Sequence, residues 1–134
     1  PIASEAWVNK VIQFAVSKIP REKIVMGLPV YAFDWGSDKP TMPDYLTYSQ
    51  AMERAKKHGV QLQFDEETMV PFYTYTANGV RHEIYFENAK SLQPKMEYAR
   101  KHRLHGVAIW RLGMEDPEIW NSLLKTYGTN KNKD

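Results

Sequence analysis

Residues 105–116 read HGVAIWRLGMED, and the strand within this stretch decides the fold. Successive side chains of a strand point to opposite faces, so one face carries Gly106, Ala108 and Trp110. That face is small and ends in a large aromatic ring, whereas the residues between these three are bulky and apolar. An apolar run of this length, without alternating polar residues, predicts a strand of a parallel sheet that is covered on both faces.

A second stretch, KIVMGLPVY at 23–31, repeats this pattern. One face carries Val25 and Gly27 and ends at Tyr31, while the opposite face is bulky throughout. Bulky faces suit packing against helices, and a small face that ends in an aromatic suits the interior of a barrel. In α/β barrels the active site lies at the C-terminal ends of the strands. Spacing alone supports two interpretations equally: Tyr31 and Trp110 line a site, or both are ordinary core aromatics.

Helix patterns flank both strands. Apolar residues at helical spacing predict a helix over 5–19 with Ser4 as its N-cap, and a second helix over about 88–103. The sequence DPEIWNSLLKTYG predicts a third helix, with Asp116 as its cap and Gly128 as its stop. Together with the strands, this order of elements is typical of part of a parallel α/β fold.

The segment between the two strands has a different pattern. Residues 33–45 are rich in Gly, Pro and Asp, which predicts a loop. Residues 46–86 then predict a small α+β insertion, with a helix capped by Thr47 and a β-hairpin that turns at Asn78-Gly79. This two-residue turn pairs residues across the hairpin: Ala77 with Val80, Tyr75 with His82, and Tyr73 with Ile84.

The composition is that of a single folded domain. The chain has 134 residues, of which 43% are hydrophobic and 25% charged. Its formal net charge of +2 is too balanced to indicate nucleic acid or a membrane surface as a partner. It has no cysteine, no apolar run near the roughly 20 residues that span a bilayer, and no recognisable signal peptide. The four histidines lack the spacing of metal ligands, so we expect neither a metal nor another cofactor.

Several ordered motifs resemble glycoside hydrolase family 18, the chitinase-like enzymes. GLPVYAFDW is similar to the seventh barrel strand of that family, and GVAIWRLG is similar to the eighth strand with its terminal tryptophan. YAFDW and FENAKSLQPKMEYA resemble most the bacterial spore-associated branch, which acts on spore cortex peptidoglycan. The resemblance implies an α/β fold in which residues 1–134 are the C-terminal portion of a TIM (β/α)8 barrel. That portion would run from helix 6 to helix 8 and carry the small α+β insertion at 46–86.

The resemblance also assigns substrate-binding residues. Trp110 would form a flat floor beneath the sugar at the cleavage point, because an indole face packs against C–H groups and excludes water. Tyr31 would offer its hydroxyl group to the sugar or to its acetamido group. Asp34 and Trp35 would line the rim of the cleft.

No catalytic residue is expected in this chain. The family's Asp-x-x-Asp-x-Asp-x-Glu run is absent, and the acidic clusters at 65–67 and 115–116 are more simply explained as turn and helix-cap residues. Family members combine one acidic Glu with the N-acetyl carbonyl of the substrate itself in a retaining reaction. We therefore expect the C-terminal part of an enzyme that hydrolyses N-acetylglucosamine-containing glycans, either spore cortex peptidoglycan or a chitin-like polymer. This chain alone is expected to be inactive.

The alternative function is a noncatalytic chitinase-like module that binds carbohydrate, because the aromatics would remain where the carboxylates are lost. A third interpretation is a stable folding unit cut from a longer protein. Two strands of an eight-stranded barrel leave sheet edges open, so we expect self-association through these strands. By resemblance, the expected location is the spore coat or cortex, or the outside of the cell.

Overall fold

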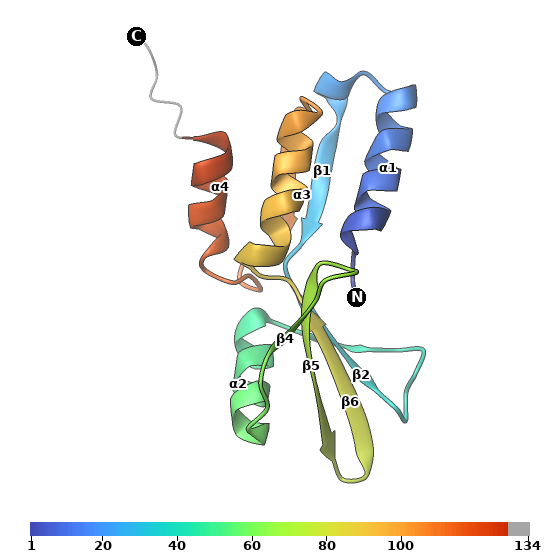
Figure 1. The fold of residues 1–134 in the computed structure, drawn as a ribbon, viewed down its shortest axis with the longest axis vertical. Coiled ribbons are helices and arrows are strands. Elements are labelled where there is room, and N and C mark those ends of the chain that lie inside the picture. Colours follow the sequence, from blue (N-terminus) through green and yellow to red (C-terminus); the bar gives the residue numbers. More distant parts are fainter. Residues whose placement is uncertain (129–134) are drawn as a thin grey trace.

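The computed structural model describes residues 1–128, and its elements form two parts (Figure 1). The upper part, here called the parallel unit, contains α1 (Glu5–Lys18), a 3-10 helix (Arg21–Lys23), β1 (Val25–Pro29), α3 (Ala89–Lys101), β7 (Gly106–Trp110) and α4 (Ile119–Tyr127). The lower part, here called the insertion, contains β2 (Ala32–Gly36), β3 (Asp44–Leu46), α2 (Tyr48–His58), β4 (Gln63–Asp65), β5 (Val70–Ala77) and β6 (Val80–Phe86). None of the helices in residues 1–128 has the length and apolar character needed to cross a membrane.

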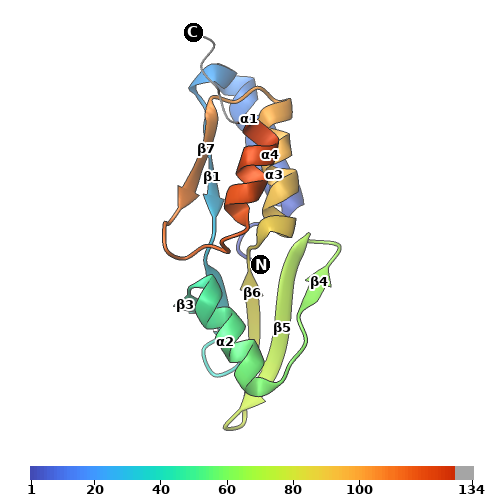
Figure 2. The same cartoon turned by 90° about the vertical axis from the view of Figure 1, so that its left-hand side faces the viewer.

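The two strands of the parallel unit pair in parallel, as predicted, with Val25 opposite Gly106 and Pro29 opposite Trp110. Their helices all lie on one side, and both C-terminal ends point toward the insertion (Figure 2). The bulky face of β1 is buried against these helices, whereas Val25 on the small face is 50% exposed. The prediction that both faces are covered is therefore wrong for the small face, because no element within residues 1–128 packs against it.

Side-chain caps mark the starts of α1 and α3. The Ser4 hydroxyl accepts a hydrogen bond from the Trp7 N–H at 3.4 Å, as predicted for the start of α1. The third helix starts later than predicted, at Ile119, and its N-cap is Glu118 rather than the predicted Asp116. The reason is that residues 116–120 form a tighter turn, in which the N–H groups of Ile119 and Trp120 donate to the carbonyls three residues earlier, at 3.1 and 3.4 Å. The Asp116 carboxylate instead accepts from the N–H groups of Glu118 and Ala89, at 3.1 and 3.0 Å, and joins this turn to the start of α3.

The insertion is a five-stranded antiparallel sheet in the order β3-β2-β6-β5-β4, with α2 on one face. The predicted hairpin register is confirmed for all three pairs. Asn78 and Gly79 have φ values of 51° and 76°, the two positive angles that a tight hairpin turn requires. The capping box of α2, in which Thr47 and Gln50 exchange hydrogen bonds of 3.1 and 2.9 Å, is also as predicted.

The predicted loop at 33–45 is wrong at both ends, because it contains β2 and β3. β2 pairs with β6 over its whole length, with Ala32 opposite Phe86 and Asp34 opposite Ile84. The side chains of Ala32 and Asp34 are buried beneath α2, so long-range pairing and packing outweigh the turn-forming composition of this stretch. The sheet therefore starts at Ala32, outside the 46–86 range.

A buried ion pair lies where the insertion returns to the parallel unit. The Glu87 carboxylate directly follows β6 and accepts from Lys95 Nζ and from the Ser91 hydroxyl, both at 2.6 Å. The side chains of Glu87 and Lys95 are fully buried. Burial raises the pKa of Glu87, and the neighbouring Lys95 and Ser91 oppose that shift. A paired and hydrogen-bonded charge of this kind fixes the junction in one geometry.

Candidate functional site

The C-terminal ends of β1 and β7 form an open hollow of about 280 Å³ on the small face of the sheet. Tyr31 and Trp110 both line it, together with Gly27, Pro29 and Trp7. The Val30 N–H donates to the Trp110 carbonyl at 3.0 Å, which extends the ladder between the strands to the point where both aromatics leave the sheet. The Trp110 side chain is 66% exposed, so its ring is available to a ligand. The structure thus brings these two predicted residues together.

Tyr31 belongs to a group of rings that continues onto the insertion. Its ring centroid lies 5.3 Å from those of both Phe33 and Tyr45. Burial raises the pKa of the Tyr31 phenol, with further contributions from Tyr45 and Glu87. The hydroxyl group is therefore protonated at neutral pH and can donate a hydrogen bond to a ligand.

Along β2, alternation places two aromatic side chains, Phe33 and Trp35, on the face of the sheet that points away from α2. The ring centroids of Phe33 and Trp35 are 5.7 Å apart, and Phe33 is 4.8 Å from Tyr45 on β3. We call Tyr31, Phe33, Trp35 and Tyr45 the aromatic row. Phe33 and Tyr45 were not among the predicted site residues. The spacing of Tyr31, Phe33 and Trp35 at every second position could have indicated the row.

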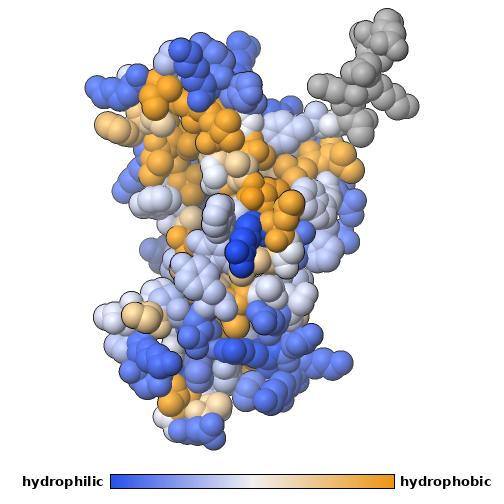
Figure 3. Space-filling model, turned by 180° about the vertical axis from the view of Figure 1, so that it is seen from behind, coloured by the Kyte–Doolittle hydropathy of each residue, from blue (hydrophilic) through white to orange (hydrophobic). Residues whose placement is uncertain are grey.

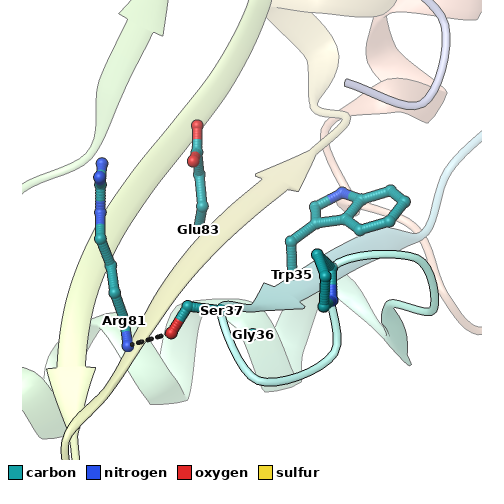
Figure 4. Close-up of a pocket in the computed structure, with 6 residues that line it drawn as sticks. Trp35, Gly36, Ser37, Arg81 and Glu83 are labelled. Atoms are coloured by element: carbon teal, nitrogen blue, oxygen red, sulfur yellow. Dashed lines mark hydrogen bonds between the residues drawn. The ribbon is translucent and has the colours of Figure 1, made fainter.

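Trp35 stands at the far end of the aromatic row, beside a second hollow of about 330 Å³ (Figure 4). Arg81 and Glu83 of β6 line the same hollow, and Glu83 lies directly opposite Trp35 in the sheet register. The predicted rim residue Trp35 is therefore on an accessible face. Its neighbours in the hollow are charged side chains that the sequence did not single out.

Asp34 points to the opposite face of β2 and is only 2% exposed. Its carboxylate forms an ion pair with Arg54 and lies 2.8 Å from His82 Nδ1, and the Tyr75 hydroxyl donates to it at 3.3 Å. The expected place of Asp34 on the rim is thus corrected, because strand alternation sends its side chain beneath α2. In this place the carboxylate joins β2 to α2, β5 and β6.

The acidic clusters serve local structure, as predicted. The Asp65 carboxylate accepts from the Glu67 N–H at 2.9 Å and from the Thr68 hydroxyl at 2.7 Å, which closes a turn between β4 and β5. Asp116 accepts from the Glu118 N–H in the turn before α4, as described above. Residues 1–128 contain no group of three or more His, Asp or Glu side chains placed to hold a metal ion.

Comparison with known proteins places this geometry in a family. The cortical fragment-lytic enzyme of Bacillus subtilis (strain 168) is 34% identical over 117 residues, which cover 84% of this chain and 27% of that enzyme. The crystal structure of the spore cortex-lytic enzyme SleL of Bacillus megaterium QM B1551 matches with a TM-score of 0.83 and 33% identity, over 94% of this chain and 30% of SleL. A chitinase from Chromobacterium violaceum ATCC 12472 matches with a TM-score of 0.83 and 28% identity, over 92% of this chain and 38% of the chitinase.

These matches confirm the predicted fold class, and the chain spans about 30% of the length of the spore enzymes. Residues 2–115 match the family described as Glycosyl hydrolases family 18. The motifs quoted above carry the same resemblance. The chain therefore belongs to glycosyl hydrolases family 18.

Proposed function

We propose that this chain forms one wall of the glycan site of a family 18 hydrolase whose catalytic carboxylates are supplied by residues outside it. The observation that carries the proposal is the hollow at the strand ends, where the exposed Trp110 ring and the protonated Tyr31 hydroxyl share one face. Flat aromatic surfaces beside a hydrogen-bond donor suit a sugar ring, which has apolar C–H faces and polar edges.

The two residues have different roles in this proposal. The Trp110 indole packs against the sugar at the cleavage point and excludes water from it. The Tyr31 hydroxyl donates to the sugar or to its acetamido group, whose carbonyl oxygen attacks the anomeric carbon. An acidic Glu outside this chain protonates the departing glycosidic oxygen, and water then opens the intermediate with retention of configuration.

This chain alone is proposed to be inactive. Glu87 is buried against Lys95, and Asp34 is buried against Arg54 and His82, so neither carboxylate can reach a glycosidic oxygen at the hollow. A general acid has to lie within hydrogen-bond distance of the oxygen that it protonates.

The proposed substrate is an N-acetylglucosamine-containing glycan of the spore cortex. Support comes from the relatives, which are described as a cortical fragment-lytic enzyme and a spore cortex-lytic enzyme. By the same likeness, the proposed location is the spore. A chitin-like polymer remains the second substrate, because a chitinase shares the fold at 28% identity.

The test is a chimera in which residues 2–115 replace the matching segment of the Bacillus subtilis enzyme. We expect the chimera to cleave cortex peptidoglycan and the 134-residue chain to leave it intact. Trp110→Ala should lower kcat/KM of the chimera by more than about tenfold, because the sugar loses its floor. The matched control is Phe14→Ala on α1, whose ring is as exposed as that of Trp110, at 67 and 66%, and lines neither hollow. Equal turnover of the Trp110→Ala and unsubstituted chimeras would overturn the role of Trp110.

A noncatalytic carbohydrate-binding module is the second candidate. It is favoured by one observation: within residues 1–128 the hollow is lined by aromatic and apolar residues and by no carboxylate. Calorimetric titration of the chain with chitin oligomers tests binding directly. Absence of heat at millimolar sugar would argue against this module, and a chimera that cleaves glycan would show that an enzyme wall is the better description.

We also propose that the isolated chain self-associates through the uncovered face of its parallel strands. Apolar residues gather over the upper half of the molecule in Figure 3, whereas the lower half is mostly hydrophilic. Beside β1, a groove of about 290 Å³ is lined by Trp7, Val11 and Val25, which are 59, 42 and 50% exposed. An apolar surface of this kind is stabilised by contact with another chain.

A further inference from the structure

Hydrogen bonds between β6 and the residue after β2 fix the backbone at the hollow beside Trp35. Ser37 and Arg81 exchange two hydrogen bonds: the Ser37 N–H donates to the Arg81 carbonyl at 2.8 Å, and the Arg81 N–H donates to the Ser37 hydroxyl at 3.1 Å. Pro40 closes the hollow on the side of the loop. The hollow lies on the face of the insertion sheet that carries the aromatic row, since Trp35 and Glu83 are a cross-strand pair.

The side chains at this hollow have complementary chemical characters. Figure 4 shows Arg81 and Glu83 extending side by side from β6, with the Trp35 indole across from them. Within residues 1–128 the Arg81 guanidinium forms no ion pair and no side-chain hydrogen bond. The Glu83 carboxylate accepts from the Tyr85 hydroxyl at 2.6 Å and keeps further lone pairs for a donor.

The aromatic row connects this hollow to the proposed glycan site. The aromatic row starts at Tyr31 in the first hollow and ends at Trp35 in the second, with successive ring centroids 5.3 and 5.7 Å apart. A glycan that rests on Trp110 and extends along the row therefore brings its next substituents to Arg81.

We propose that the Trp35–Arg81 hollow binds the carboxylate-bearing substituent of a muramic-type amino sugar. The guanidinium of Arg81 takes the carboxylate, Glu83 accepts an amide N–H, and Trp35 packs against the apolar part of the substituent. A guanidinium presents paired N–H donors that match the two oxygens of a carboxylate. A polymer of N-acetylglucosamine alone has no carboxylate, so this hollow would favour peptidoglycan over chitin. The inference rests on the proposed function and names its substrate class.

Such a sugar carries its carboxylate in one of two places: on the lactyl ether when the lactyl group is free, or on the peptide when the lactyl carboxyl is joined to a peptide as an amide. Three soluble probes separate them: N-acetylglucosamine, N-acetylmuramic acid and N-acetylmuramyl-L-alanyl-D-isoglutamine. Saturation-transfer NMR with the 134-residue chain measures the affinity for each probe. We expect both carboxylate probes to bind more tightly than the neutral sugar. Tighter binding of the dipeptide probe assigns the peptide carboxylate, and tighter binding of N-acetylmuramic acid assigns the lactyl carboxylate, which the dipeptide probe carries as an amide.

Arg81→Met removes the charge and keeps the length of the side chain. It should weaken binding of the carboxylate probes by about five- to tenfold and leave N-acetylglucosamine unchanged, because only the charge-assisted hydrogen bonds are lost. The matched control is Arg21→Met, which removes the same charge from the 3-10 helix at the opposite end of β1. Circular dichroism establishes that both variants are folded.

Equal affinity of all three probes, or equal effects of Arg81→Met and Arg21→Met, would overturn the inference. Trp110→Ala distinguishes this failure from failure of the proposed function. If Trp110→Ala abolishes binding while Arg81→Met has no effect, the glycan site stands and the carboxylate pocket does not. As a second measurement, Arg81→Met in the chimera should lower kcat/KM on peptidoglycan and leave cleavage of chitin oligomers unchanged.

Discussion

At the residue scale, Asp34 shows how one step along a strand changes the role of a side chain. Trp35 and Phe33 lie on the face of the sheet away from α2, while Asp34 between them is buried against Arg54, His82 and Tyr75. The same loop-like stretch thus contributes to an aromatic surface and to a polar core. A buried carboxylate with several partners is costly to disturb, because its partners stay behind without it.

Replacing Asp34 by Asn should destabilise the chain. Asn keeps the size of the side chain and removes the charge that Arg54 and His82 contact, so we expect the free energy of unfolding to fall by about 2 kcal/mol. Urea unfolding followed by circular dichroism measures the change. Asp44→Asn is the control, since Asp44 lies opposite Asp34 in the register but is exposed. Similar midpoints for both variants would contradict a structural role of the Asp34 charge.

The Tyr85 phenol should lose its proton at a higher pH than an ordinary tyrosine. Burial raises its pKa to about 12, and the Glu83 carboxylate, which accepts its hydrogen bond, adds to the shift. The unfolded value is about 10, so the folded state holds this proton more tightly. Its contribution to stability is complete below about pH 10 and is lost as the pH rises toward the folded pKa.

Glu83→Gln removes the largest cause after burial and should bring the pKa of Tyr85 closer to 10. Tyrosine labelled with carbon-13 at Cζ reports this titration by NMR. Glu53→Gln serves as the control, because Glu53 lies on α2, on the other face of the sheet. An unchanged Tyr85 titration in Glu83→Gln would mean that the Glu83 carboxylate does not contribute to the raised pKa.

At the element scale, sequence patterns predicted the helices, the hairpin and the parallel pair well, because each depends on local spacing, caps or turns. They failed for β2 and β3, whose strand geometry comes from residues far along the chain: Asp34 pairs with Ile84 and is enclosed by α2. They also placed Trp110 and Tyr31 on one face correctly. The charged hollow at Arg81 could not be predicted, because it depends on the register between β2 and β6.

The hairpin turn offers a test of one element. Gly79 has a φ of 76°, in the region where a Cβ atom is unfavourable, so Gly79→Ala should lower the free energy of unfolding by about 1 kcal/mol. Chemical denaturation measures this loss. Asn78→Gly is the paired control and should be close to neutral, since glycine adopts the φ of 51° found at that position. Equal stability of Gly79→Ala and the unsubstituted chain would contradict the turn geometry.

At the scale of the whole molecule, the two parts differ in how they meet solvent. The insertion has its own core and a mostly hydrophilic surface, whereas the parallel unit leaves one face of its sheet uncovered within residues 1–128. Residues 1–128 hold only two parallel strands, with helices on one side, which explains why the prediction of two covered faces failed.

The isolated chain should therefore form dimers or larger species at tens of micromolar in light scattering. Val25→Lys places a charge on the uncovered face and should shift the population toward monomer, because burying an unpaired ammonium is unfavourable. Thr76→Lys, on the exposed hairpin of the insertion, carries the same charge and should leave the assembly unchanged. A monomeric unsubstituted chain would rule out this association.

The pairing of Ala32 with Phe86 has a consequence for how such a protein can change over time. Because β2 and β6 are neighbours, the chain leaves the parallel unit and returns to it at points only about 5 Å apart. A tight turn of two residues could bridge that gap, and the strands carrying Tyr31 and Trp110 would keep their places. The fold therefore allows this insertion to be lost, gained or replaced as one piece while the parallel unit is kept.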